Sequence, residues 1–253
     1  MVAAVPAQSP QPNVTVPNAG AFEVRVPAPG PDAIADTVIQ NAIDTAAAAG
    51  GGVVRLGAGD FKLSRRAGDE PIVLKSGVTL RGQGYATHLY LDPATPPNAA
   101  RYYPVRIGTE TTSASNVVVE HLRYTGNNAK IGGGSIMGFN ARLGTLESRL
   151  LSSDNVTIRN CWIYDAQQAA GCMKEGVLAF ATAERLAAQF KNWQVCHNLI
   201  DTCGNKAVEF DECNGGLIAD MISVPNTTMA SSHVMVRGNM LRKAGTCTLN
   251  ASQ

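Results

Sequence analysis

The chain has 253 residues, and its 21 basic and 20 acidic residues leave a formal net charge of +1. This balance excludes the strongly basic surface that is typical of nucleic-acid-binding proteins, and no apolar run approaches the length of a membrane-spanning helix. Charged residues make up only 16% of the chain and aromatic residues 6%, while 25 residues are glycine. Such a composition favours many short strands over a helical bundle.

The first residues, "MVAAVPAQSPQPNVTVPNAG", form a stretch rich in Pro, Ala and Asn. It lacks a basic segment followed by a long apolar one, so no signal peptide is visible. We expect a flexible lead-in over residues 1–20 and a single domain over residues 21–253.

A helix is predicted over residues 33–49, because apolar residues recur on one face at helical spacing: Ile39, Ala42, Ile43 and Ala46. Three glycines, Gly50–Gly52, then precede the strand-like segment "VVRL". Phosphate-binding loops run in the order strand, glycines, helix, so this reversed order argues against a nucleotide site. The glycines are predicted to end the helix and turn the chain.

A short phrase then recurs along the chain as "SGVTLRGQG", "SNVVVEHLR", "DNVTIRNCW", "KNWQVCHNL" and "SHVMVRGNM". Aligning Val78, Val117, Val156, Trp193 and Val234 gives steps of 39, 39, 37 and 41 residues. Apolar and polar residues alternate in each phrase, as in a strand with one buried face. Five copies at nearly constant spacing predict a solenoid, most simply a parallel β-helix whose coils stack about 4.8 Å apart.

The segments "IQNAIDTAAAAGGGVVRLGAGDFKLS" and "IVLKSGVTLRGQGYATHLYLD" resemble the opening of the pectin-lyase-like superfamily, which includes pectate lyases and phage tailspikes. The resemblance covers the chain from about residue 32 to its end. It implies an all-β fold, a right-handed parallel β-helix over residues 52–253, whose first coil is capped by the short N-terminal α-helix. An uncapped first coil would expose a row of unpaired backbone groups.

In this superfamily the third strand of each coil usually forms the substrate groove. We align residues 133–140, 174–181 and 205–212 as successive third strands. Alternation then predicts three outward columns, which are Gly134, Glu175 and Lys206; Met137, Leu178 and Glu209; and Phe139, Phe180 and Asp211.

From these columns we take as candidate catalytic residues Lys174, Glu175, Lys206, Glu209 and Asp211, and as candidate substrate-binding residues Phe139, Phe180 and Glu212. Glu209 and Asp211 are two residues apart on one strand, which places their carboxylates roughly 6.5–7 Å apart. That separation suits an inverting glycosidase, although a solvated acidic strand edge has the same spacing. Glu175 above Lys206 fits either a lyase-type base with its partner or a surface salt bridge.

Two hypotheses on function remain open. The chain is either a polysaccharide-acting enzyme, that is a lyase, a glycoside hydrolase or an epimerase, or a non-catalytic glycan-binding domain of a phage tailspike or surface adhesin. The catalytic motifs of polygalacturonases and the Asp-Pro-His-Glu motif of mannuronan epimerases are absent. Both hypotheses predict a polysaccharide partner and a location outside the cell, on its surface or on a virion. A tailspike would form a homotrimer, and the carboxylates could hold Ca²⁺ against an acidic sugar.

The six cysteines include no CxxC pair, and the four histidines are scattered, so a metal site is poorly supported. We expect most thiols to be reduced. Cys196 aligns with Arg159 and Arg237, which predicts that it points outward at a corner of its coil. The last phrase is expected to begin a coil that stops unfinished, so that the chain continues beyond Gln253 or another subunit covers this end.

Overall fold

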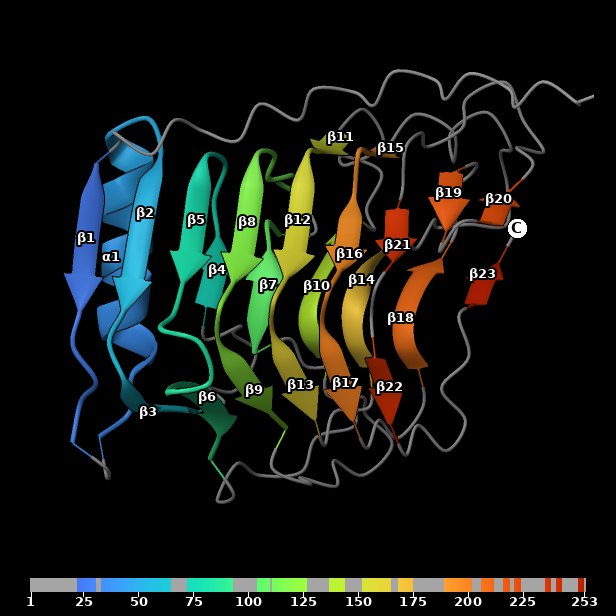
Figure 1. Cartoon of the computed structure of the whole chain (residues 1–253). Coiled ribbons are helices and arrows are strands. Elements are labelled where there is room, and N and C mark those ends of the chain that lie inside the picture. Colours follow the sequence, from blue (N-terminus) through green and yellow to red (C-terminus); the bar gives the residue numbers. More distant parts are fainter. Residues whose placement is uncertain are drawn as a thin grey trace, which may run out of the picture.

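The protein is built from short parallel strands that wind into a solenoid, with one helix at its N-terminal end (Figure 1). The computed structural model describes residues 22–30, 33–64, 72–92, 104–109, 111–126, 137–143, 152–164, 168–174, 189–201, 206–211, 216–218, 221–223, 235–237, 240–242 and 250–252. Residues 1–20, the predicted lead-in, lie outside these ranges.

Three parallel sheets run along the solenoid. The first has the strand order β1 (Glu23–Val26), β2 (Gly52–Leu56), β5 (Val78–Arg81), β8 (Val117–Glu120), β12 (Val156–Arg159), β16 (Gln194–Cys196) and β21 (Met235–Arg237). The second has the order β3 (Gly59–Leu63), β6 (Thr87–Leu91), β9 (Arg123–Thr125), β13 (Trp162–Tyr164), β17 (Leu199–Asp201) and β22 (Met240–Arg242). The third has the order β4 (Ile72–Leu74), β7 (Val105–Ile107), β10 (Met137–Leu143), β14 (Gln168–Lys174), β18 (Lys206–Asp211) and β23 (Asn250–Ser252).

Two further strand pairs lie outside these sheets. Strands β11 (Ser152–Asp154) and β15 (Gln189–Lys191) are parallel, and β19 (Gly216–Ile218) and β20 (Met221–Ser223) are antiparallel. The main chain visits the first, second and third sheets in turn, so each coil contributes one strand to each sheet. Coils of this kind connect parallel strands with right-handed crossovers.

The register of the first sheet confirms the repeat that the sequence predicts. Val117 pairs with Val156, and Thr79 with Val118, so the aligned positions of the phrase are neighbours in the sheet. The residues of the inward rows are fully buried: Val54, Leu80, Val119, Ile158 and Val195 in the first sheet, and Phe61, Leu89, Tyr124, Ile163 and Ile200 in the second. The core is therefore a stack of one apolar layer per coil.

Helix α1 (Asp36–Ala48) confirms the predicted cap. Its four predicted apolar positions are at most 5% exposed and belong to the main core, and the helix packs against β1, β2 and β4. At its C-terminus Gly51 N donates to Ala46 O at 3.0 Å, and Gly50 adopts a φ of 86°. This is the glycine-ended helix that the sequence predicts. Strand β1, which the sequence analysis did not predict, pairs with β2 and covers the edge of the first sheet.

Residues in the left-handed region turn the chain at both ends of the recurring strand. Asn116, Asn155 and Asn192 precede the strands with φ between 54° and 58°, and they form a ladder in which each Nδ2 donates to the preceding Oδ1 at 2.9 Å. His121, Asn160 and His197 follow the strands with similar φ angles. Asn and His occupy this region more readily than most side chains, which explains their recurrence at these turns.

The alignment that we predicted for the third strands is wrong. Strand β14 spans Gln168–Lys174, so only Lys174 of the aligned segment 174–181 belongs to it, and Gln168 pairs with both Met137 and Lys206. Phe139 consequently pairs with Ala170, whose other neighbour is Val208, and does not share a column with Asp211. The connection between β13 and β14 is shorter than that between β9 and β10, so the middle strand begins earlier in the chain than the predicted segment.

The last coil has the third strand that the sequence analysis did not find, while the expectation that further chain or another subunit covers this end stays a prediction. Strands β21, β22 and β23 each join a different one of the three sheets, so this coil has all three strands. Its third strand, "NAS", is short and lacks the apolar alternation by which the earlier strands were found.

Cys196 lies in the predicted column, paired with Arg159 and Arg237, but its side chain is only 5% exposed. Cys161 and Cys196 are both free thiols. That most of the six cysteines are reduced stays a prediction. Burial raises the pKa of the Cys161 thiol to about 12, which disfavours the reactive thiolate.

Candidate functional site

Five of the residues that we predicted to form the site lie in strands of the third sheet. Strand β18 contains Lys206, Glu209 and Asp211, strand β14 ends at Lys174, and strand β10 contains Phe139. Glu175, Phe180 and Glu212 lie outside the described residues.

No two of these candidate residues are directly paired between strands β14 and β18. Lys206 pairs with Gln168, Glu209 with Gly171, and Asp211 with Met173. Their roles in catalysis or substrate binding therefore remain predictions.

A different cluster of polar and aromatic side chains lies on the outer face of the second sheet. Strand alternation gives this face two outer rows on either side of the buried row through Phe61 and Leu89. One row consists of Asp60, His88, Arg123 and Trp162, and the other of Lys62, Tyr90, Thr125 and Tyr164.

Five rings gather here, and we call them the aromatic platform: Tyr85, His88, Tyr90, Trp162 and Tyr164. Trp162 and Tyr164 have ring centroids 4.8 Å apart, and Tyr85 meets Trp162 edge-on at 5.6 Å. His88 stacks with Tyr90 at 5.3 Å and lies nearly parallel to Tyr164 at 6.2 Å. Such contacts fix the ring positions, and Tyr85, with 52% of its surface exposed, presents an aromatic face to solvent.

A hydrogen-bonded chain runs across this platform from Asp60 to His88 to Tyr164. His88 Nδ1 lies 2.8 Å from Asp60 Oδ1, and the Tyr164 hydroxyl lies 3.2 Å from His88 Nε2. A carboxylate oxygen accepts, so Nδ1 carries the proton, and Nε2 then accepts from the tyrosine hydroxyl. Asp60 and His88 come from adjacent coils, whereas Tyr164 lies two coils beyond His88, with β9 between them, and the register of β3, β6, β9 and β13 brings the three side chains together.

The surroundings of His88 favour the neutral form of its imidazole. Burial lowers the pKa of His88, and the positive charge of Arg123 lowers it further, against the opposing hydrogen bond to Asp60. Arg123 Nη2 lies 4.0 Å from Asp60 Oδ1. A neutral imidazole held between a carboxylate and a hydroxyl can accept a proton through the hydroxyl and return it, which is the chemistry of a general acid–base pair.

Sequence analysis missed this cluster, although a signal for it is present. In "THLYL" and "WIY" the ring-bearing residues alternate with buried aliphatic residues, which predicts outward rings on two strands. We searched only the third strand of each coil. Even a search of all strands would not have shown that Tyr164 reaches His88, because the two residues are 76 positions apart.

In the described ranges no helix is long and apolar enough to cross a membrane. The same residues contain no group of three or more His, Cys, Asp or Glu side chains that could hold a metal ion.

No family model and no curated protein matches this sequence. Among solved structures, the chain is similar to the A-module of the mannuronan C-5 epimerase AlgE6 from Azotobacter vinelandii, with a TM-score of 0.50 and 16% identity over 83% of this chain and 52% of that one. It is also similar to a candidate glycosyl hydrolase from Parabacteroides merdae, with a TM-score of 0.50 and 13% identity over 92% of this chain and 100% of that one. The chain thus spans about half the length of the epimerase module.

The chain is a right-handed parallel β-helix of the pectin-lyase-like fold. At these identities the similarity establishes the fold alone, because one fold supports many activities. A tailspike of the Escherichia coli bacteriophage HK620, solved with a pentasaccharide, matches at a TM-score of 0.27, which is too low to support an argument.

Proposed function

We propose that this protein binds a polysaccharide across the aromatic platform and acts on it. The observation that supports this best is the cluster of five rings next to Asp60 and Arg123 on the outside of a rigid sheet. Pyranose rings have apolar C–H faces that pack on aromatic rings, and hydroxyls that hydrogen-bond to nearby charged groups. Aromatic side chains supply much of the contact area at binding sites of this kind.

The chemistry that we propose is proton transfer through Asp60, His88 and Tyr164. The Tyr164 hydroxyl would withdraw a proton from the sugar, or give one to it, while His88 exchanges the proton of that hydroxyl and Asp60 holds the imidazole in the required tautomer. The same step begins both epimerisation and elimination next to a sugar carboxylate, and protonation of a glycosidic oxygen begins hydrolysis. Because a mannuronan epimerase module has a similar fold, reactions on polysaccharides are the first that should be tested.

The candidates on the third sheet remain a separate proposal for the catalytic site. Lys206, Glu209 and Asp211 share strand β18, and an acid–base pair two residues apart would suit hydrolysis. A location outside the cell, on its surface or on a virion stays a proposal that accompanies the proposed substrate. A trimer would be expected if the protein is a tailspike.

Binding is tested by screening a glycan array with the wild-type protein and then with Tyr85→Ala. Tyr85 and Phe22 are exposed to 52% and 47%, so Phe22→Ala is a matched control that removes an exposed ring away from the platform. We expect Tyr85→Ala to weaken binding of the best glycan by about tenfold, the effect of losing roughly 1.4 kcal/mol, and Phe22→Ala to leave it unchanged. Equal affinities for all three proteins would contradict the platform.

Catalysis is tested on the glycans that bind. Unsaturated products are followed by absorbance, new reducing ends by a colour reaction, and epimerisation by uptake of deuterium from solvent. We expect Tyr164→Phe, which removes only the hydroxyl, to lower kcat by about 10²–10⁴-fold with little change in glycan affinity. His88→Gln should lower kcat by a similar factor and, because it removes a ring of the platform, should also weaken binding. If Glu209→Gln abolishes turnover while Tyr164→Phe does not, the active site lies on the third sheet. Full binding without turnover by any assay would favour a binding protein.

A further inference from the structure

The outer face of the first sheet contains a column in which five of seven residues are arginine. One residue from each of its seven strands lies in the same register: Arg25, Arg55, Arg81, Glu120, Arg159, Cys196 and Arg237. For a chain with a net charge of only +1, this is a local concentration of one sign of charge. We call its described side chains, Arg25, Arg55, Arg81 and Arg159, the arginine strip.

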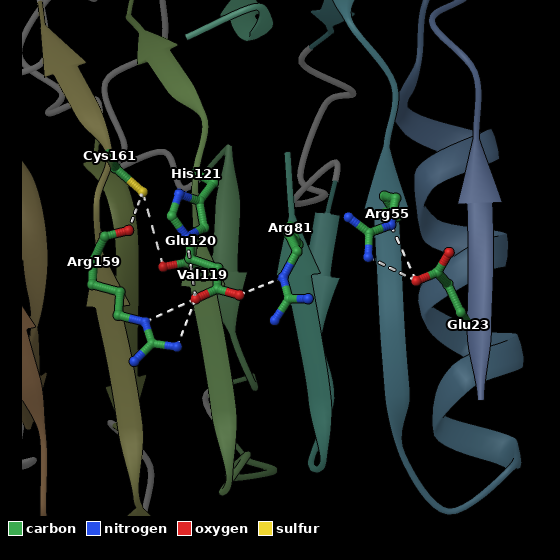
Figure 2. A network of polar contacts seen from close by, with 8 residues as sticks. All are labelled: Glu23, Arg55, Arg81, Val119, Glu120, His121, Arg159 and Cys161. Atoms are coloured by element: carbon green, nitrogen blue, oxygen red, sulfur yellow. Dashed lines mark hydrogen bonds and ion pairs between the residues drawn. The ribbon is translucent and has the colours of Figure 1, made fainter. Parts of the chain in front are cut away.

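Two carboxylates hold the strip in place, and each is hydrogen-bonded to two arginines. Figure 2 shows Glu120 with Arg81 and Arg159, and Glu23 with Arg55. Glu23 accepts from Arg55 at 2.9 Å and from Arg25 at 2.8 Å, and these hydrogen bonds lower the pKa of Glu23 to about 2. Glu120 accepts from Arg159 at 2.7 Å and also from Arg81 Nε. Burial alone would raise the pKa of Glu120, but the two arginines outweigh it and hold the pKa below its usual value.

In the described part of the chain, the arginine strip carries more positive charge than its two carboxylates neutralise, and some of its N–H groups have no acceptor. Four arginines face two carboxylates, and like charges in neighbouring strands destabilise a sheet. Arg25 and Arg81 contact their carboxylates only through Nε, so in the described part of the chain both Nη atoms of each remain available to another acceptor. The side chains of Arg25, Arg55, Arg81 and Arg159 are exposed to 81%, 33%, 27% and 33%, whereas Glu120 is exposed to only 1%. The face that meets solvent is therefore cationic.

We propose that the arginine strip binds the acidic groups of a linear anionic polysaccharide that runs along the axis of the solenoid. Guanidinium groups pair with carboxylate or sulfate through two parallel hydrogen bonds. Arg25, Arg55 and Arg81 repeat at the coil spacing of about 4.8 Å, and Arg159 follows two coils beyond Arg81. One sugar residue in a polyuronate advances the chain by a distance comparable to one coil. The polymer can thus place one acidic group near each guanidinium.

The arginine strip is separate from the aromatic platform, which lies on the second sheet. Its role is to select a glycan that carries negative charge. It relies on the proposed function only in taking a polysaccharide as the partner. An anion that neutralises neighbouring arginines also removes their mutual repulsion, so binding is expected to stabilise the fold.

The test is calorimetric titration with a galacturonate oligomer and with a neutral cello-oligosaccharide of equal length, at several salt concentrations. The variants are Arg25→Gln, Arg55→Gln and the double variant. Lys75→Gln is the matched control, because Lys75 is a half-exposed cation with one carboxylate partner, Asp44 at 2.9 Å. We expect the double variant to bind galacturonate about tenfold more weakly or worse. The slope of log affinity against log salt should fall by about 1 for each arginine removed.

Wild-type affinity and salt dependence in both arginine variants would overturn the proposal, as would a failure of the wild-type protein to bind any galacturonate or sulfated oligomer. Competition by single-stranded DNA that is as effective as galacturonate at equal charge would overturn the assignment to polysaccharide. Failure of the proposed function is detected with a different variant, since Tyr85→Ala tests the platform while the strip stays intact. Melting temperatures of all variants show whether a loss of binding reflects unfolding.

Discussion

At the scale of single residues, polar side chains at the ends of strands hold neighbouring coils together. Asn198 is 2% exposed, and its amide accepts from Cys161 N and donates to Ile158 O, both at 3.0 Å. Trp193 Nε1 donates to Ser153 O at 2.8 Å. These bonds satisfy backbone groups that the turns leave without ladder partners, and buried polar groups without partners are costly. On the outer faces, the same coil-to-coil stacking brings His88, Asp60 and Tyr164 together.

The histidine in the platform is expected to make stability depend on pH. The pKa of His88 is lowered from 6.5, so between the lowered value and about 6.5 the unfolded chain binds more protons than the folded one. The stability that the neutral imidazole contributes is complete when the pH is above the pKa of His88 in the unfolded chain. It is lost as the pH falls toward the pKa of His88 in the folded protein. The free energy of unfolding, measured with urea between about pH 8 and pH 5, should therefore fall less steeply with decreasing pH in His88→Gln than in the wild-type protein. Identical curves would show that His88 does not contribute.

At the scale of elements, helix α1 closes the N-terminal end of the core. Ile39 and Ile43 are fully buried, and Val38 on the outer side of the same helix is 42% exposed. A parallel β-helix needs such a cover, since the apolar layer of its first coil would otherwise meet water. The helix has no side-chain hydrogen bond at its N-cap, so packing of this face is its main source of stability.

The helix allows a matched pair of substitutions. Ile43→Ala should lower the free energy of unfolding by about 2–4 kcal/mol, because it leaves a cavity in a fully buried layer. Val38→Ala removes a β-branched side chain from the exposed side of the same helix and should change stability by no more than about 0.5 kcal/mol. Chemical denaturation measures both. Equal effects of the two substitutions would mean that α1 does not cap the core.

At the scale of the whole molecule, each coil contacts mainly the coils before and after it. Strand β5 lies between β2 and β8 in the first sheet, and β16 lies two strands beyond β8. In solenoids of this kind stability is approximately a sum of terms for each repeat and for each interface between neighbours. Damage to one coil is therefore expected to spread along the axis and to weaken with distance.

Hydrogen exchange of Leu80→Ala tests this expectation. Leu80 is fully buried in β5, so its removal should speed amide exchange most in β2, β5 and β8 and least in β16. Val195→Ala, which removes a fully buried side chain from β16, should produce the opposite gradient. A uniform increase along the chain in both variants would instead indicate a single cooperative unit.

The sequence by itself determined the features that depend on local periodicity. The alternation around Val78, Val117 and Val156 predicted strands, their spacing predicted neighbouring coils, and the apolar face of residues 33–49 predicted the capping helix, all of which the structure confirms. These predictions succeed because burial of alternate residues is imposed on each strand separately, and because coils of similar length place equivalent residues in register.

Only the tertiary structure decided where the third strands lie and which side chains meet. The connections before β10 and β14 differ in length, and the recurring phrase does not reveal this difference, so the predicted neighbours of Phe139 and Lys174 were wrong. The approach of Tyr164 to His88 depends on how far a side chain reaches across two coils, which the pattern of either strand does not contain. Burial does not constrain the polar and aromatic residues on an outer face, so the sequence pattern does not predict which of them meet. Their contacts depend on how the coils stack.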